Sequence, residues 1–209
     1  GYAGVWSHEN SREGIFSALT RREVYASTGP RITLRFFGGW QYQREDLSRA
    51  DFAEHAYALG TPMGGTLTEA QTGSVPGFLV AAAKDPASAN LDRIQIIKVW
   101  NDTDGQYHES IVDVAVANRA GMDAPQAYSD QPGLGVTPQE FSGQAALSGY
   151  WEDLDFDPAL RAGYYARVLE VATPRWTTYD VSEFGGETPD EVPESVQQRA
   201  YTSPIWYSP

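Results

Sequence analysis

From Arg31 onward the apolar residues of this chain recur with the period of β-strands, and this pattern restricts the fold strongly. Residues 31–37 alternate Ile32, Leu34 and Phe36 with polar residues, as in a strand with one buried face. Further segments of strand character are 77–83, 93–100, 109–117 and 164–171. Because no alternating pattern of helices separates them, the sequence predicts an antiparallel β-sandwich and not a parallel α/β sheet.

The segments 93–100 and 109–117 are joined by the turn sequence Asn101-Asp-Thr-Asp-Gly105, which predicts a hairpin. The stretches 41–69 and 120–148 are rich in Gly, Pro, Ser, Asp and Gln, and we expect long surface connections there, with a short helix at 49–58. The positions that we expect to face inward are Ile32, Leu34, Phe36, Leu79, Ile94, Ile96, Val112, Val114, Tyr165 and Val168.

The first thirty residues have a different pattern. Asn10-Ser-Arg-Glu13 has the form of a capping box, so a helix is predicted to start there and to end near Glu23. Ile15, Phe16 and Leu19 give this helix one apolar face. The predicted fold class is therefore mainly β, an antiparallel β-sandwich preceded by one α-helix.

Charge and composition exclude several classes of function. Lys and Arg total 15 against 28 Asp and Glu, a net charge of −13, which has the wrong sign for binding nucleic acid or an anionic membrane. The longest apolar stretch, 78–83, is far shorter than the roughly 20 residues of a membrane helix. The absence of cysteine excludes disulfides, thiolate catalysis and cysteine-ligated metals. Since the chain starts at Gly1 without a leader, we interpret it as part of a longer protein.

No local catalytic motif is present. His8, His55 and His108 are far apart and have no metal-ligand spacing. There is no nucleophile elbow of the form G-x-S-x-G and no phosphate-binding glycine loop, and the paired glycines indicate turns or bulges.

An acidic run between Trp151 and Pro158 allows two interpretations. Asp153, Asp155 and Asp157 occupy every second position, as in half of a calcium loop, but the glycine and distal glutamate of such a loop are lacking. The alternatives are a structural calcium ion and a solvated acidic loop. The aromatic residues towards the C-terminus are likewise open to two interpretations, core packing first and sugar stacking second, and they are Tyr164, Tyr165, Trp176, Tyr179, Trp206 and Tyr207.

Several longer runs together resemble a bacterial family known as domain of unknown function 3604. They follow the family order over nearly the whole chain and are 4–12, 21–32, 35–40, 62–65, 84–86, 90–98, 156–158, 164–170, 173–180 and 198–207. The resemblance implies a relative of the polymerase and histidinol phosphatase (PHP) superfamily of metal-dependent hydrolases, which act through two or three divalent ions.

The resemblance also implies that the chain contains two regions with different roles. Residues 1–30 would close an upstream metal-binding barrel, and 31–209 would form a C-terminal β-sandwich domain. The superfamily's metal ligands would precede Gly1, so none is assigned here. Glu9, Asn10 and Arg12 match the family and would line the rim of the active site, whereas His8 replaces a residue that is usually acidic. Arg12 would contact a substrate anion; the alternative is an ion pair with Glu9 or Glu13.

Two functions follow as expectations. The first is the C-terminal portion of a PHP-like hydrolase of phosphoester, ester or amide substrates, with divalent metal ions in the upstream barrel. This chain alone would then be inactive, and the barrel would be its partner. The second is a non-catalytic module for carbohydrate binding or extracellular assembly. A homo-oligomer is open under both. Many family members carry signal peptides, which favours a periplasmic or extracellular location.

Overall fold

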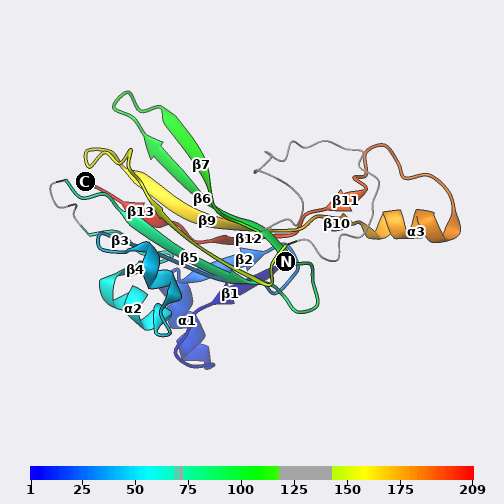
Figure 1. Ribbon diagram of the computed structural model, residues 1–209, viewed down its shortest axis with the longest axis horizontal. Helices are drawn as coiled ribbons and strands as arrows, with labels where there is room; N and C mark the ends of the chain where they lie inside the picture. Colours follow the sequence, from blue (N-terminus) through cyan, green and yellow to red (C-terminus); the bar gives the residue numbers. More distant parts are fainter. Residues whose placement is uncertain (69, 71–72, 118–142) are drawn as a thin grey trace.

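The computed structural model describes residues 1–68, 70, 73–117 and 143–209, and strands predominate in this part of the chain (Figure 1). The helices are α1 (Arg12–Thr20), α2 (Phe52–Leu59), α3 (Trp176–Phe184) and the short 3-10 helix η1 (Arg44–Ser48). The longer strands are β3 (Thr33–Gly39), β5 (Gly77–Ala83), β6 (Leu91–Asn101), β7 (Tyr107–Val116), β8 (Ala146–Glu152) and β9 (Ala162–Glu170). The shorter ones are β1 (Tyr2–Val5), β2 (Val24–Ser27), β4 (Gly60–Pro62), β10 (Thr173–Pro174), β11 (Ser195–Val196), β12 (Arg199–Thr202) and β13 (Ile205–Tyr207).

Two antiparallel sheets make up the body of the protein. The larger has the strand order β1-β2-β12-β9-β6-β7, with β13 also paired with β9, and the smaller has the order β4-β3-β5-β8. Strands β10 and β11 form a separate two-stranded ribbon. The predicted mainly β fold with antiparallel sandwich architecture is confirmed.

The main core contains apolar side chains from both sheets. Alternate residues of β3 and β5 from the small sheet meet alternate residues of β6 and β9 from the large one. Six of the predicted inward positions are buried there, and they are Ile32, Leu34, Phe36, Ile94, Ile96 and Val168. Val112 and Val114 are only half-buried, because β7 is the last strand of its sheet.

Two of the predicted inward positions need correction. Phe78 and Val80 of β5 face the main core, so Leu79 between them points to the other face, where it is buried under η1 and α2. In β9 the buried aromatic residue is Tyr164, whose ring lies 4.4 Å from that of Phe78, centroid to centroid, and Tyr165 is half-buried on the opposite face. A shift of one residue in a strand exchanges the two faces.

The predicted hairpin is formed by β6 and β7, and helix α2 lies close to the predicted 49–58. The expected connection 41–69 also contains η1 and β4. The expected connection 120–148 is corrected at its end, where β8 begins at Ala146 and pairs along the whole of β5. The rest of that connection, 118–142, lies outside the described residues.

Helix α1 differs from its prediction at both ends. Its N-cap is Ser11 and not Asn10, because the Ser11 hydroxyl accepts a hydrogen bond from the Gly14 amide at 3.0 Å. It ends at Thr20 and not near Glu23, since Arg22 takes a left-handed conformation with φ of 61°. None of the described helices is long and apolar enough to span a membrane.

Candidate functional site

Helix α1 and the loop before it project from the sandwich on the side that also carries α2 (Figure 1). Strands β1 and β2, which the sequence analysis missed, flank this unit, and β2 pairs with β12 of the large sheet. Only Ala18 of α1 is buried. The predicted apolar face forms, but Ile15, Phe16 and Leu19 are 37%, 69% and 47% exposed. The face that was expected to pack therefore has no cover within the described chain.

Trp6 fixes the base of this projecting unit to the small sheet. Its indole nitrogen Nε1 donates a hydrogen bond to the carbonyl oxygen of Leu34 at 2.8 Å. The guanidinium of Arg35 lies 3.5 Å from the centre of the Trp6 ring, a cation–π contact. Leu34 and Arg35 both belong to β3, so Trp6 is fixed to the small sheet at the start of the loop that leads to α1.

A buried carboxylate forms a second anchor. Glu23 is 4% exposed, lies 3.3 Å from the Arg21 guanidinium and accepts a hydrogen bond from the hydroxyl of Tyr57 on α2. Burial, and then the neighbouring Glu23 carboxylate, raise the pKa of Tyr57 to about 12, so the tyrosine keeps its proton at neutral pH. This bond ties the end of α1 to α2.

A close approach between the backbones of Gly64 and Arg22 is the third contact that fixes the α1 unit to the sandwich. Gly64, with φ of +85°, lies so near Arg22 that a Cβ at this position would be 2.1 Å from the Arg22 carbonyl oxygen. The Gly64 amide donates to the carbonyl of Pro204 at 3.0 Å. Glycine is required here both by the conformation and by the contact.

The three predicted rim residues lie together at the exposed tip of the unit. Glu9 and Asn10 precede the N-cap, and Arg12 is the first residue of α1. The Ser11 hydroxyl donates to the Glu9 carboxylate at 2.7 Å and orients it. The alternative of an Arg12 ion pair with Glu9 or Glu13 finds no support, because Arg12 makes no ion pair with any described residue.

The spacing of α1 places Arg12 on the apolar face. Residues 12, 15, 16 and 19 follow the i, i+3, i+4, i+7 pattern of one helix face. The unit thus presents three apolar side chains, with a free guanidinium at the end nearest the tip and an amide and a carboxylate beside it. This set can bind an anion by a charged fork, but it contains no nucleophile with an adjacent base.

The acidic run does not form a cation site in this structure. Asp153 is 2% exposed; its Oδ2 lies 2.6 Å from the ammonium nitrogen of Lys98 and accepts a hydrogen bond from the Tyr164 hydroxyl at 2.7 Å. Asp155 and Asp157 are exposed. Among the described residues no group of three or more His, Cys, Asp or Glu side chains could hold a metal ion. Of the two alternatives, the solvated loop fits the exposed Asp155 and Asp157, whereas Asp153 is buried and has Lys98 as its counter-charge.

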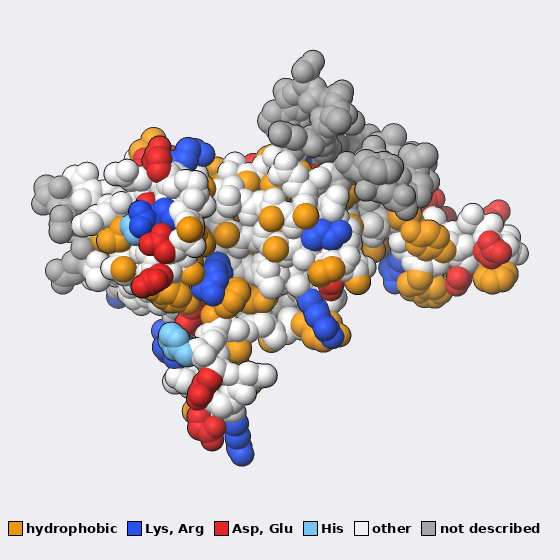
Figure 2. Space-filling model, turned by 60° about the horizontal axis from the view of Figure 1, so that its bottom comes forward, with side chains coloured by type: hydrophobic (Ala, Val, Ile, Leu, Met, Phe, Trp, Pro, Cys, Tyr) orange, Lys and Arg blue, Asp and Glu red, His pale blue; other side chains and the backbone are white. Residues whose placement is uncertain are grey.

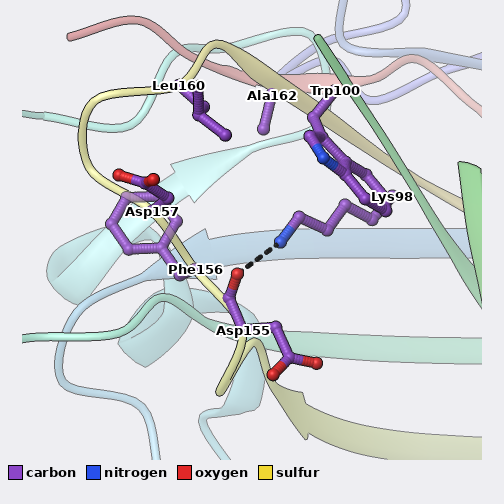
Figure 3. Close-up of a pocket in the computed structure, with 7 residues that line it drawn as sticks. All are labelled: Lys98, Trp100, Asp155, Phe156, Asp157, Leu160 and Ala162. Atoms are coloured by element: carbon purple, nitrogen blue, oxygen red, sulfur yellow. Dashed lines mark hydrogen bonds between the residues drawn. The ribbon is translucent and has the colours of Figure 1, made fainter. Parts of the chain in front are cut away.

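A small cavity lies beside this ion pair (Figure 3). It is lined by Lys98, Trp100, Asp155, Phe156, Asp157, Leu160 and Ala162 and has a volume of about 20 Å³, which is room for one water molecule. The ammonium of Lys98 also donates to the Asp155 carbonyl at 3.2 Å. Since ligand pockets are commonly an order of magnitude larger, we assign no ligand to this cavity.

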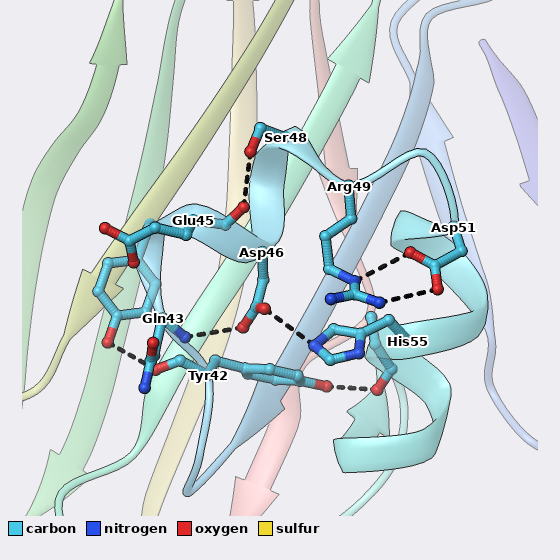
Figure 4. A network of polar contacts seen from close by, with 10 residues as sticks. Tyr42, Gln43, Glu45, Asp46, Ser48, Arg49, Asp51 and His55 are labelled. Carbon is cyan, nitrogen blue, oxygen red and sulfur yellow. Dashed lines mark hydrogen bonds and ion pairs between the residues drawn. The ribbon is translucent and has the colours of Figure 1, made fainter.

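His55 and His108 each have a structural partner. His55 contacts Asp46 at 2.9 Å in a polar network that joins η1 to α2, and Arg49 and Asp51 form an ion pair beside it (Figure 4). His108 contacts Asp102 across the β6–β7 turn at 2.7 Å. Neither arrangement includes a nucleophile, and His8 is exposed at the tip.

The six aromatic residues differ in how deeply the structure buries them. Tyr164 and Tyr207 are buried in the core, as expected first, and are not available for sugar stacking. Tyr165 is half-buried, whereas Trp176, Tyr179 and Trp206 are 65%, 56% and 44% exposed, so core packing was the wrong prediction for these three exposed residues. In the structure no residue of α3 is buried, so this helix has no inner face. The sequence alone does not predict this exposure.

Fold and site together define a β-sandwich module that carries a projecting helix with Glu9, Asn10 and Arg12 at its exposed tip. The profile of the family described as "Protein of unknown function (DUF3604)" matches residues 1–209. The chain belongs to this family. Comparisons with curated proteins and with solved structures found no match.

Proposed function

We propose that this chain is the C-terminal part of a PHP-like metal-dependent hydrolase of phosphoester, ester or amide substrates. Its metal site would lie in a catalytic barrel domain that precedes it. The described residues do not fit the metal site themselves, because they contain no suitable group of ligands, and we assign no metal-dependent step to them. The ions would supply an activated water and charge neutralisation in the barrel.

The uncovered face of α1 is the observation that carries this proposal. Three large apolar side chains stand exposed on one helix face, although the base of the helix is fixed to the sandwich through Trp6, Glu23 and Gly64. A rigidly mounted apolar face is typical of a surface that packs against another domain. Packing the catalytic domain there would bring Arg12 to the boundary between the two domains.

The role proposed for Arg12 is to bind an anionic oxygen of the substrate at the rim of the site. Its guanidinium has no carboxylate partner in the described chain, so it is available for a substrate anion. A charge-assisted hydrogen bond contributes about 1.5–3 kcal/mol, which corresponds to roughly 10- to 150-fold in kcat/KM. The Asn10 amide beside it can donate to the same anionic oxygen, and the Glu9 carboxylate can accept only from a hydroxyl or N–H group of the substrate.

The test uses the full-length protein with Mn²⁺ or Zn²⁺ and compares a phosphodiester with a neutral carboxylic ester. We expect turnover by the full-length protein and none by the 209-residue chain alone. Arg12→Ala should lower kcat/KM for the phosphodiester by roughly 10- to 150-fold and leave thermal stability unchanged. Arg161→Ala is the matched control, an exposed arginine between β8 and β9, and it should change neither. Robust turnover by the isolated chain would contradict the proposal, as would a full-length protein inactive on both substrates.

A further inference from the structure

Residues 173–196 form an arm, here called the α3 arm, that lies beyond one end of the sandwich (Figure 1). It consists of β10, α3, the following loop and β11, and among the described strands β10 pairs only with β11, over two residue pairs. Helix α3 itself buries no residue. The arm is therefore joined to the body mainly through its two ends.

Helix α3 is too short to be stable without a partner. It has nine residues, and its N-cap Arg175 makes no side-chain capping bond. Isolated helices of fewer than about 12–15 residues are marginal in water, because the cost of nucleation exceeds the gain from the few bonds made. Within the described chain α3 is held by hydrogen bonds from the Thr178 hydroxyl and the Arg175 amide to the Glu194 carbonyl oxygen, so a surface that covers α3 would stabilise it further.

One face of α3 is both aromatic and acidic. Trp176, Tyr179 and Phe184 are 65%, 56% and 82% exposed. Asp180 and Glu183 lie on the same face, since residues 176, 179, 180, 183 and 184 follow helical spacing. Figure 2 shows hydrophobic and acidic side chains together on this arm, at the right of the view. Such a face needs an apolar groove to receive the rings and cations to meet the carboxylates.

The charge of the arm sets the chemistry of its partner. Residues 173–196 contain one basic residue, Arg175, and six acidic residues, which are Asp180, Glu183, Glu187, Asp190, Glu191 and Glu194. This charge repels nucleic acid and anionic membranes. It also disfavours a second copy of the chain, whose net charge is −13. A protein surface with an apolar groove edged by Lys and Arg is complementary to it.

We propose that the α3 arm docks into such a cationic, apolar groove on the catalytic domain, which makes it a second contact in addition to the α1 face. This inference rests on the proposed function for the identity of the partner. Three aromatic side chains are a small contact, but within one polypeptide the first contact raises the effective concentration of the second into the millimolar range. Two contacts, one at α1 and one at the end of the sandwich that carries the arm, would fix the tip of α1 against the catalytic domain (Figure 1).

The experiment measures amide hydrogen exchange of α3 in the full-length protein by mass spectrometry. A docked α3 should exchange at least about tenfold more slowly than an unstructured peptide of the same sequence. Trp176→Ala with Phe184→Ala should remove this protection. Tyr107→Ala is the matched control, an aromatic residue that is 87% exposed on the β6–β7 hairpin, and it should leave α3 unchanged. In 1 M NaCl the wild-type protection should fall, and Asp180→Asn with Glu183→Gln should already show the reduced value at low salt.

The outcomes separate this inference from the proposed function. Exchange of wild-type α3 at the rate of an unstructured peptide would overturn the inference even if the protein hydrolyses the phosphodiester. Protection that appears only at high protein concentration would also overturn it, since a second copy would then be the partner. Concentration-independent protection that the double alanine variant removes supports docking on the same chain. A protein with that protection but without hydrolase activity would refute the proposed function alone.

Discussion

Replacing Asp153 by Asn tests the buried ion pair between Asp153, which follows the end of β8, and Lys98 of β6. The Asp153 and Lys98 side chains are 2% and 9% exposed, and their charged atoms are 2.6 Å apart. Asn keeps the size of the side chain and an oxygen that can accept the hydrogen bond from Tyr164, so the change removes little except the negative charge. The ammonium of Lys98 is then left in the core without a counter-charge.

The expected cost follows from what Lys98 retains. Removing one partner of a buried pair costs about 3–5 kcal/mol, because the remaining charge is uncompensated. Lys98 still donates to the Asp155 carbonyl oxygen at 3.2 Å, so we expect the lower end, about 3 kcal/mol. Adding Lys98→Met to Asp153→Asn should restore part of this loss, since no buried charge remains.

The assay is urea unfolding of the purified chain at pH 7, followed by tryptophan fluorescence and circular dichroism and analysed as a double-mutant cycle. Asp155→Asn is the matched control: Lys98 contacts the backbone oxygen of Asp155 and not its exposed carboxylate, so its stability should stay within about 0.5 kcal/mol of wild type. The reasoning fails if Asp153→Asn costs less than about 1 kcal/mol, or if Asp155→Asn costs as much as Asp153→Asn.

Three further predictions concern other parts of the fold. Millimolar calcium should leave the melting temperature unchanged, because Asp153 is paired with Lys98; a calcium-dependent rise that Asp155→Asn abolishes would restore the calcium alternative. Gly64→Ala should lower the unfolding free energy by more than about 2 kcal/mol, since its Cβ would meet the Arg22 carbonyl, and an unchanged urea midpoint would contradict the close approach. Burial raises the pKa of Glu170 in the native state above its ordinary value of 4.5. At pH values between the unfolded-state pKa and the native-state pKa, the native state binds more protons than the unfolded state. The stability that this group contributes therefore falls as the pH rises through that window. Glu170→Gln should flatten this part of the curve of unfolding free energy against pH, and a curve identical to wild type would disprove the assignment.

The strands with clear alternation could be predicted because their signal is local. Segment 77–83 was delimited correctly at both ends, since its apolar run is bounded by polar residues and turns. Strands β1 and β2 were missed, each only four residues long. Their place in the sheet depends on β12, more than 170 residues along the chain, and no local periodicity reports such a pairing.

The sequence indicates which residues form the exposed face and tip of α1, but it does not show what surrounds them. The spacing of Ile15, Phe16 and Leu19 specifies which side of α1 is apolar, but it does not say whether a partner for that side exists in the same chain. The alternation of Asp153, Asp155 and Asp157 likewise does not reveal that Asp153 forms an ion pair with Lys98 of a different strand. In both cases the missing information is a contact between segments that are distant in sequence.

The charges on the two uncovered helix faces constrain the domain proposed to cover them. The α1 face carries the free guanidinium of Arg12, and the α3 face carries Asp180 and Glu183. A uniformly basic surface would repel the first, and a uniformly acidic one would repel the second. The catalytic domain must therefore present a cationic groove to α3 and, at the Arg12 end of α1, either a carboxylate or a space that a substrate anion fills. If that space is the substrate site, phosphate should bind the full-length protein more weakly after Arg12→Ala and equally well after Asp180→Asn.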